Sequence, residues 1–335
     1  MSNEDKIPYS ILDLASVKEG GTFSETFRNS VDLARHAEEW GYTRFWMAEH
    51  HNMAGIASAA TSVLIGHVAG ATKSIRVGSG GVMLPNHPSM VIAEQFGTLE
   101  ALYPGRIDLG VGRAPGSDQL TARALGRDMH AADRFPEQVR ELLDFLGPQA
   151  YQAKVTAIPG VDSNVPVWLL GSSTFSAQLA ALIGLPFAFA AHFAPRMLHE
   201  ALRLYRENFQ PSKWMEKPYA MVGIPVVAAE SDAEARFLAT SMYQRILRLH
   251  RGHPILIPPP IESMDDKWNE FERHGVESHL GAAIIGGPDT VREKLAQFVS
   301  ATRCDEIMIA TDVYDHAKRL RSYEIVSRQM PVLVA

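Results

Sequence analysis

Short apolar runs alternate with longer stretches of helical periodicity along almost the whole chain. The runs predict eight strands, at residues 8–14, 44–47, 75–80, 107–112, 165–170, 186–190, 219–228 and 306–310. Strands that alternate with helices are typical of βα units around a parallel sheet. Because no composition break could serve as a linker, we predict one domain, residues 1–335, folded as a closed (β/α)8 TIM barrel rather than as two doubly wound domains.

The helices predicted between these strands have characteristic ends. Thr22 and Glu25 are spaced as a capping box, which begins a helix, and Gly41 can adopt the left-handed conformation that ends it. Pro288 suits the first position of a later helix, whose inner face is formed by Val291, Leu295 and Phe298.

Two stretches are longer than ordinary loops. Residues 113–134 follow the fourth predicted strand, and residues 252–280 lie between the seventh and the eighth. In a barrel both insertions emerge at the carboxyl-terminal face, where catalytic loops sit. Each could therefore be a lid over a site or an insertion that merely covers the barrel end.

Composition and charge restrict the possible partners. A chain of 335 residues with 46% apolar residues can bury a large core, and its net charge of −6 disfavours a nucleic-acid surface. The lone Cys304 permits no internal disulfide and no cysteine-based zinc site. No apolar run approaches the roughly 20 residues that span a bilayer, and residues 1–10 do not resemble a signal peptide. We expect a cytoplasmic protein with a small-molecule partner and no membrane attachment.

The end of the second predicted strand carries candidate chemistry. An apolar run, 45–48, leads directly into Glu49, His50 and His51. Residues just past a barrel strand point into the shared cleft, where an imidazole can move a proton near neutral pH and a carboxylate can orient it. For His51 we keep the simpler interpretation, a hydrogen bond within a loop or a subunit interface. We expect no metal site, because adjacent histidines on an extended segment diverge and no third ligand is paired with them by spacing.

Two further strand ends could contact a flat, anionic ligand. Gly80 and Gly81 would let the backbone approach a planar ring, although on glycine count alone a tight strand-to-loop turn explains them better. In the fifth unit, residues 171–176 (GSSTFS) begin an Ala-rich helix, whose free amides would attract a phosphate, while plain N-capping by Ser172 or Ser173 needs no ligand. Arg113, which ends the neighbouring fourth strand, could reach that phosphate. Residues 110–112 (GVG) are no dinucleotide fingerprint, because the third glycine is missing.

Together these segments resemble the bacterial luciferase-like flavin monooxygenases over nearly the whole chain. The resemblance is carried, in order, by residues 48–52 (AEHHN), 77–88 (VGSGGVMLPNHP), 93–99 (AEQFGTL), 103–113 (YPGRIDLGVGR), 166–173 (PVWLLGSS) and 185–186 (LP). Their order and spacing make a chance match implausible.

The resemblance implies a role for each matching residue. His50 matches the family's catalytic histidine, which assists proton transfer beside the flavin, with Glu49 next to it. Gly80 and Gly81 match a pair joined by a cis peptide against the isoalloxazine ring. The remaining cofactor-binding positions are Arg113, Arg134, Leu170, Gly171, Ser172, Ser173 and Ser176. Residues 252–280 fall on the family's mobile active-site loop.

Some residues depart from luciferase itself. Gly112 stands where luciferase has a reactive cysteine, and Ser172 replaces a glutamate of the phosphate turn. Light emission and luciferase's aldehyde specificity are therefore not expected, whereas the resemblance still implies the cofactor.

The resemblance thus implies a two-component monooxygenase that takes FMNH2 from a separate, transiently bound flavin reductase and uses O2 on a small organic substrate. Two alternatives stay open: an F420-dependent hydride-transfer oxidoreductase and a non-catalytic flavin-binding protein. We also expect a homodimer, because the predicted helices at 58–71 and 89–103 carry small and apolar residues that could pack between subunits, although buried barrel helices would look similar.

Overall fold

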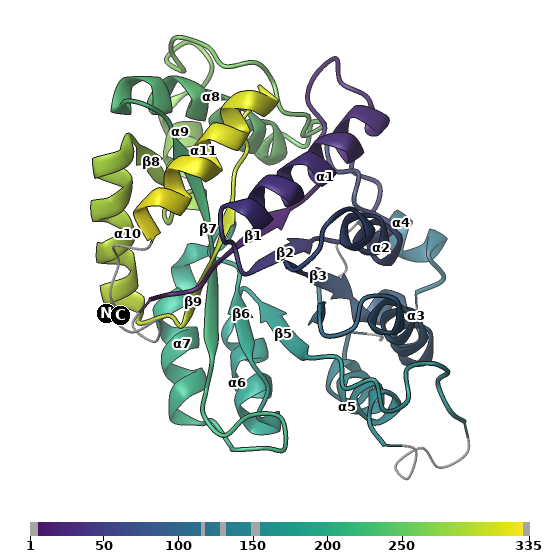
Figure 1. Cartoon of the computed structure of the whole chain (residues 1–335). Helices are drawn as coiled ribbons and strands as arrows, with labels where there is room; N and C mark the ends of the chain where they lie inside the picture. Colours follow the sequence, from purple (N-terminus) through teal and green to yellow (C-terminus); the bar gives the residue numbers. More distant parts are fainter. Residues whose placement is uncertain (1–5, 115–117, 128–131, 149–154, 331–335) are drawn as a thin grey trace.

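The computed structural model describes residues 6–114, 118–127, 132–148 and 155–330. Within them, eight parallel strands close a barrel: β1 (Tyr9–Asp13), β2 (Arg44–Met47), β3 (Arg76–Met83), β4 (Ile107–Gly112), β5 (Val167–Gly171), β6 (Phe187–Phe189), β7 (Ala220–Ala228) and β9 (Glu306–Ala310). The barrel closes through β6–β7, β7–β9 and β9–β1 (Figure 1). The predicted (β/α)8 barrel is confirmed.

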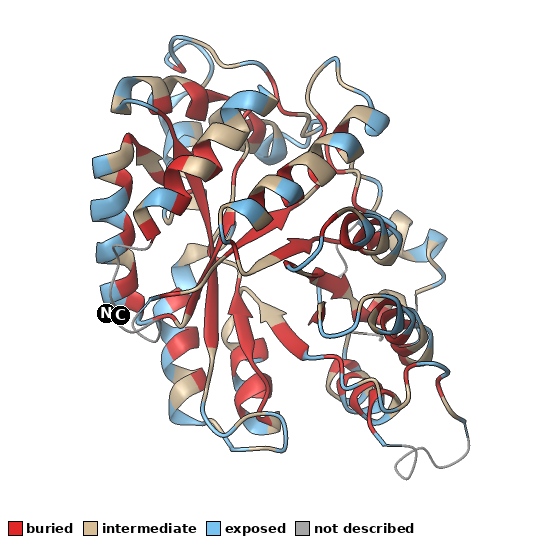
Figure 2. Cartoon of the chain, viewed as in Figure 1, coloured by how far each residue is buried: buried red, intermediate tan, exposed pale blue. Residues whose placement is uncertain are grey.

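Helices surround the barrel, and each of the described α-helices except α4 contains buried residues (Figure 2). They are α1 (Phe23–Glu39), α2 (Thr61–Ala71), α3 (Ser89–Leu102), α4 (Gln119–Ala124), α5 (Phe135–Leu146), α6 (Thr174–Ile183), α7 (Leu198–Glu207), α8 (Asp232–His250), α9 (Glu270–His279), α10 (Pro288–Thr302) and α11 (His316–Gln329), with short 3-10 turns at Leu84–Asn86 and Pro195–Met197. None of the described helices combines the length and the apolar character that a membrane span requires.

The ends of two predicted elements differ from expectation. Oγ1 of Thr22 accepts the amide of Glu25 at 3.1 Å, but the Glu25 carboxylate pairs with Lys18 at 2.7 Å, so the predicted capping box is only half formed. Gly41 does adopt a left-handed φ of +79°, and α10 does begin at Pro288, as predicted.

The segment between β7 and β9 contains a strand that the sequence analysis missed. β8 (Ile284–Gly286) has only three residues and pairs with the carboxyl half of β7. The segment 252–280, which precedes β8, includes α9. The backbone of Ile257 forms hydrogen bonds with the backbone of Val17 and Glu19, in the loop after β1. Whether this segment moves as a lid stays a prediction. The insertion 113–134 contains α4, but its residues 115–117 and 128–131 lie outside the described residues.

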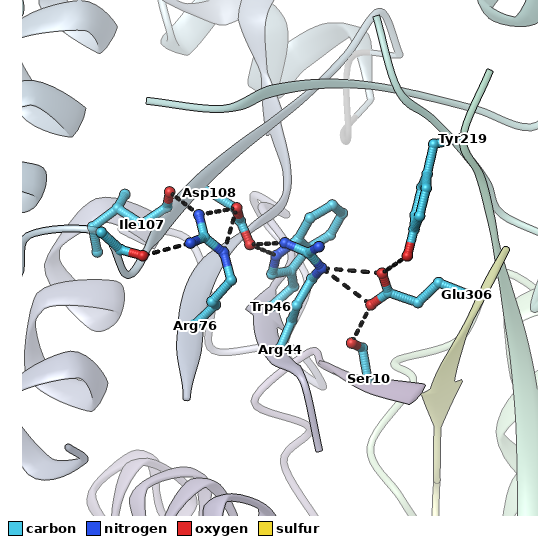
Figure 3. Close-up of polar contacts among 9 residues, drawn as sticks. Ser10, Arg44, Trp46, Arg76, Ile107, Asp108, Tyr219 and Glu306 are labelled. Carbon is cyan, nitrogen blue, oxygen red and sulfur yellow. Dashed lines mark hydrogen bonds and ion pairs between the residues drawn. The ribbon is translucent and has the colours of Figure 1, made fainter. Parts of the chain in front are cut away.

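The amino end of the barrel is closed by buried charges (Figure 3). Arg44 donates to Asp108 at 2.8 Å and to Glu306 at 3.1 Å, and both carboxylates are fully buried. Arg76 also holds Asp108, at 2.6 Å, and the Tyr219 hydroxyl donates to Glu306 at 2.9 Å. These polar groups are hydrogen-bonded to one another, so this end of the barrel has a structural role rather than a ligand-binding one.

Large side chains fill the middle of the barrel and small ones its carboxyl end. Leu12, Trp46 and Trp168 form the central plug together with neighbouring apolar residues. At the carboxyl end, by contrast, a side chain on Gly80 would come within 2.7 Å of Leu12, and one on Gly223 within 2.9 Å of His192. Glycine is therefore needed at both positions, because neighbouring side chains already occupy the space that a side chain there would take.

Candidate functional site

A cavity of about 50 Å³ lies at the carboxyl end of the barrel, among β1, β7, β9 and α8. Its apolar wall consists of Leu12, Leu14, Pro225, Met242, Ile246, Leu280 and Ala310, and its polar wall of Ser16, His192, Thr311, Asp312 and Arg319. The charged groups are already paired, since Asp312 contacts Arg245 at 2.5 Å and Arg319 contacts Asp13 at 2.9 Å. The cavity is much smaller than ligand pockets of about 300–1,000 Å³, so it has room for only a small apolar group, with His192 as a polar contact.

His50 lies three residues beyond β2 and is partly buried. Burial and, next, the neighbouring Arg245 guanidinium lower the pKa of its imidazole to about 4. Its Nδ1 atom is buried and has no hydrogen-bond partner among the described residues. A neutral imidazole with an unused ring nitrogen is able to exchange a proton with a bound molecule.

His192, three residues beyond β6, is a candidate that the sequence analysis missed. Its pKa is lowered to about 4 by burial and, next, by the proximity of His50. Its ring is placed against Gly223 of β7, where any side chain would collide with it. The available signal was a single histidine after two alanines at the end of a short strand, which by itself is more often structural.

Glu49 does not orient His50, contrary to the sequence-based expectation. Its Oε1 atom lies 2.8 Å from Nε2 of His51 and 2.8 Å from Nε2 of His87, and its Oε2 accepts the Met83 amide at 3.0 Å. Burial alone would raise the pKa of Glu49, but the bonds from His87, His51 and Met83 outweigh it, so the pKa lies below its usual value. Successive side chains of an extended segment diverge, which turns Glu49 and His50 in different directions.

His51 forms a hydrogen bond within the loops, as the simpler interpretation predicted. His87, at the end of the 3-10 turn after β3, joins it on the same carboxylate. Sequence spacing paired no third ligand with the adjacent histidines. In the structure β2 and β3 are neighbours, and their pairing brings His87 to Glu49 and His51.

The glycine pair within β3 has the backbone that the resemblance implies. The peptide bond between Gly80 and Gly81 is cis, and the pairing of β3 with β4 shifts at this point. A side chain on Gly81 would lie 2.7 Å from the carbonyl oxygen of Gly110 and 3.0 Å from Leu170. Leu170, predicted for the cofactor site, thus lies against the glycine pair.

The turn from β5 into α6 leaves its first amides unclaimed by a cap. Ser173 is the N-cap residue, yet its side chain makes no capping bond, so plain N-capping by Ser173 is not observed. Ser176 is buried so closely against Gly171 that a Cβ at Gly171 would lie 2.5 Å from it. Ser172 is half-buried in the same turn.

Arg113 reaches this turn from the end of β4. Its guanidinium carbon lies 4.1 Å from the centre of the Phe175 ring, in the first turn of α6, so the structure brings these two predicted parts together. Arg134 is the exposed N-cap residue of α5, and its helix packs on α3. Its place in a phosphate site stays a prediction.

A family model described as luciferase-like monooxygenase matches residues 7–303. The uncharacterized protein YvbT of Bacillus subtilis (strain 168) is 58% identical over 319 residues, which cover 95% of both chains. The luciferase-like monooxygenase of Escherichia coli (strain K12) is 55% identical over 320 residues, 95% of this chain and 96% of the relative. The N-acetyl-S-alkylcysteine monooxygenase of Bacillus subtilis (strain 168) is 35% identical over 328 residues, 96% and 97% of the two chains.

Solved structures share the same barrel. The crystal structure of apo-MsnO8 has a TM-score of 0.87 and 32% identity, and the likeness covers 99% of this chain and 100% of that one. The oxygenating constituent of 3,6-diketocamphane monooxygenase from Pseudomonas putida, in complex with FMN, has a TM-score of 0.75 at 18% identity, over 98% and 99% of the chains. An F420-dependent secondary alcohol dehydrogenase has a TM-score of 0.71 at 15% identity, over 97% and 99%.

Proposed function

The chain belongs to the luciferase-like monooxygenase family, and from that premise we propose that it is a two-component monooxygenase: with reduced FMN from a separate reductase, it uses O2 to oxidise a small, mostly apolar organic molecule. The observation that carries the proposal is the meeting of Arg113 with the uncapped start of α6, one strand away from the Gly80–Gly81 peptide. A cation and free amides suit a phosphate, and a bare backbone suits a flat ring.

The residues around this place fit FMN in their chemistry. Gly171 lets an anion approach the amides of α6, and Ser172, Ser173 and Ser176 add hydroxyl groups in the same turn. The FMN complex of a structural neighbour supports the choice of cofactor. When bound, reduced FMN supplies the electrons that activate O2.

The protein's own residues would bind the cofactor, position the reacting molecules and shield the reaction. Arg113 and the start of α6 would hold the phosphate, and Gly80 with Gly81 would admit the ring next to Leu170. His50 would give or take a proton at a ring nitrogen, since its Nδ1 has no partner among the described residues. Glu49, bound to His51 and His87, acts as a positioning residue for the two loops rather than on the reacting atoms.

The cavity beside His192, of about 50 Å³, would accept a small apolar part of the substrate. Its wall of leucine, methionine, isoleucine and proline side chains favours an apolar body, and the imidazole offers one hydrogen bond. The relative that acts as an N-acetyl-S-alkylcysteine monooxygenase supports a small organic molecule as the substrate class.

A homodimer is part of the proposal. Val63 on α2 and Leu102 on α3 are apolar residues that expose 68% and 62% of their surface. A second copy of the chain would cover these neighbouring helices. We expect light scattering to give twice the chain mass, and Val63→Glu with Leu102→Glu to give monomers.

The test of the proposed function separates it from the two alternatives. Purified protein is titrated anaerobically with FMN, FMNH2 and F420, and then mixed with isotope-labelled O2 and aldehydes, alkanesulfonates, aromatic compounds or N-acetyl-S-alkylcysteines. The proposal predicts preferred binding of FMNH2 and a product that carries labelled oxygen. Hydride transfer with F420, which a structural neighbour uses, would instead indicate a dehydrogenase. Flavin binding without O2 consumption would indicate a storage protein.

A further inference from the structure

Three donor side chains meet beside the proposed flavin site without a role in it. We infer that Glu49, His51 and His87 form a binding site for a single divalent transition-metal cation. In the part of the chain that the structure describes, this is the one group of three histidine, cysteine or acidic donors whose atoms all lie within 4.8 Å of one another.

The distances are close to those of a metal site. Nε2 of His51 and Nε2 of His87 each lie 2.8 Å from Oε1 of Glu49. Metal–ligand bonds of about 2.1 Å place neighbouring ligand atoms about 3.0 Å apart in an octahedral site and about 3.4 Å apart in a tetrahedral one. Each contact needs to widen by only a few tenths of an ångström for a cation to enter.

The two imidazoles and the carboxylate of this group meet at one atom. Both imidazoles converge on a single oxygen of Glu49, although the carboxylate offers two, and the other oxygen receives only the Met83 amide. A shared focus of three donor atoms is what a cation requires. Two imidazoles and a carboxylate also form a common donor set for zinc and other first-row metals.

The buried charge of Glu49 and the partial exposure of the two histidines also support a cation site. The Glu49 side chain is 2% exposed, so its negative charge is largely removed from water, and a cation would balance it. The side chains of His51 and His87 are 16% and 28% exposed, which leaves an open side for entry and for a water ligand. Binding needs each neutral ring to carry its proton on Nδ1 instead of Nε2, so no other group must change its charge.

A cation at this place would tie together the two loops that frame the proposed active site. Glu49 and His51 flank His50 after β2, and His87 follows the Gly80–Gly81 strand, β3. The cation would fix these loops whether or not a flavin is bound. The inference therefore stands apart from the proposed function and can fail without it.

The experiment measures metal directly, on the untagged full-length protein. The protein is stripped with a chelator and dialysed against micromolar Zn²⁺, metal content is determined by mass spectrometry, and Co²⁺ is used as a spectroscopic probe. We expect one equivalent of Zn²⁺, a rise in Tm, and Co²⁺ ligand-field bands. Glu49→Gln and His87→Ala should each weaken Zn²⁺ binding by more than the roughly 100-fold that loss of an outer-shell partner causes.

The control is a second histidine pair elsewhere on the surface. His250 on α8 and His279 on α9 lie 3.4 Å apart, and His250→Ala should leave the stoichiometric uptake unchanged. His87→Ala removes a partly exposed side chain, so a folded variant is expected, and circular dichroism checks this. Absence of stoichiometric uptake by the wild type, or equal uptake by Glu49→Gln and His87→Ala, would overturn the inference and leave a hydrogen-bonded triad.

Discussion

The guanidinium of Arg113 rests on the ring of Phe175, 4.1 Å from its centre. This contact joins the end of β4 to the first turn of α6, although Arg113 and Phe175 are 62 positions apart in the chain. A planar cation over an aromatic face is attracted to it and keeps its N–H groups free at the edges. Under the proposed function, this stacking would orient the arginine toward an oxyanion at the start of α6.

Phe175→Ala tests whether this stacking prepares Arg113. The loss of a cation–π contact worth about 0.5–1 kcal/mol should weaken FMN binding by roughly two- to fivefold. Fluorescence titration of FMN measures the effect. Leu182→Ala, another exposed apolar side chain of α6, is the matched control and should leave FMN affinity unchanged. Equal affinity of wild type and Phe175→Ala would mean that Arg113 needs no such support.

His50→Ala should abolish most substrate oxidation and leave FMN bound. Removal of a group that transfers protons typically lowers turnover by about 10²- to 10⁴-fold. Single-turnover kinetics with pre-bound FMNH2 separate this loss from cofactor affinity. His67→Ala, on the exposed side of α2, serves as the control. Unchanged turnover in His50→Ala, or a loss confined to FMN binding, would remove His50 from the proton-transfer role.

The buried His192 should make the fold sensitive to mild acid. Its pKa is about 4 in the folded chain against about 6.5 when unfolded, because burial disfavours the charged ring. Between these values the unfolded chain binds more protons, so stability falls as the pH falls through this window, by about 2 kcal/mol at pH 5. Urea unfolding at pH 7.5 and pH 5 measures the change.

His192→Phe removes the titrating group while keeping a ring of similar size in the cavity. Its stability should therefore decline less than that of the wild type between pH 7.5 and pH 5, whereas His67→Ala should decline as the wild type does. Equal declines in wild type and His192→Phe would contradict the burial of a neutral imidazole.

Arg44→Met should destabilise the barrel from its closed end. The substitution leaves the buried carboxylates of Asp108 and Glu306 with fewer partners, although Arg76 and Tyr219 remain (Figure 3). Breaking a buried ion pair from one side costs about 3–5 kcal/mol. Urea denaturation at neutral pH measures the free energy of unfolding. Arg328→Met, which removes an exposed pair with Glu324, should cost at most about 1 kcal/mol. Similar losses in both variants would contradict the buried network.

The barrel could be predicted from sequence because its signal is repeated. Each of the eight strands is an apolar run of several residues, and β2, β4 and β9 begin and end where the pattern predicts. β8 was missed because three residues between Ala283 and Gly287 show neither periodicity nor length. The extension of β3 to Met83 was missed because glycines usually end a strand, whereas here β3 continues past a shift in its pairing with β4.

The site was predictable only where it follows strand ends. His50, the glycine pair and the turn before α6 could be placed because barrel strands deliver such residues to one face. The contact between Glu49 and His87 could not be predicted, since His87 lies 38 positions away and only the pairing of β2 with β3 brings it near. His192 carried no motif, and its importance depends on Gly223 and the cavity around it.

The most direct test of the account compares the affinities of FMNH2 and reduced riboflavin, which differ only in the phosphate, for wild type and for Arg113→Ala. Anaerobic titration should show that the wild type binds FMNH2 more tightly by about 10- to 100-fold, as hydrogen bonds from a charged group of about 1.5–3 kcal/mol imply. Arg113→Ala should lose most of this preference, while Arg328→Ala keeps it. Equal affinity of the wild type for the two flavins would contradict the account.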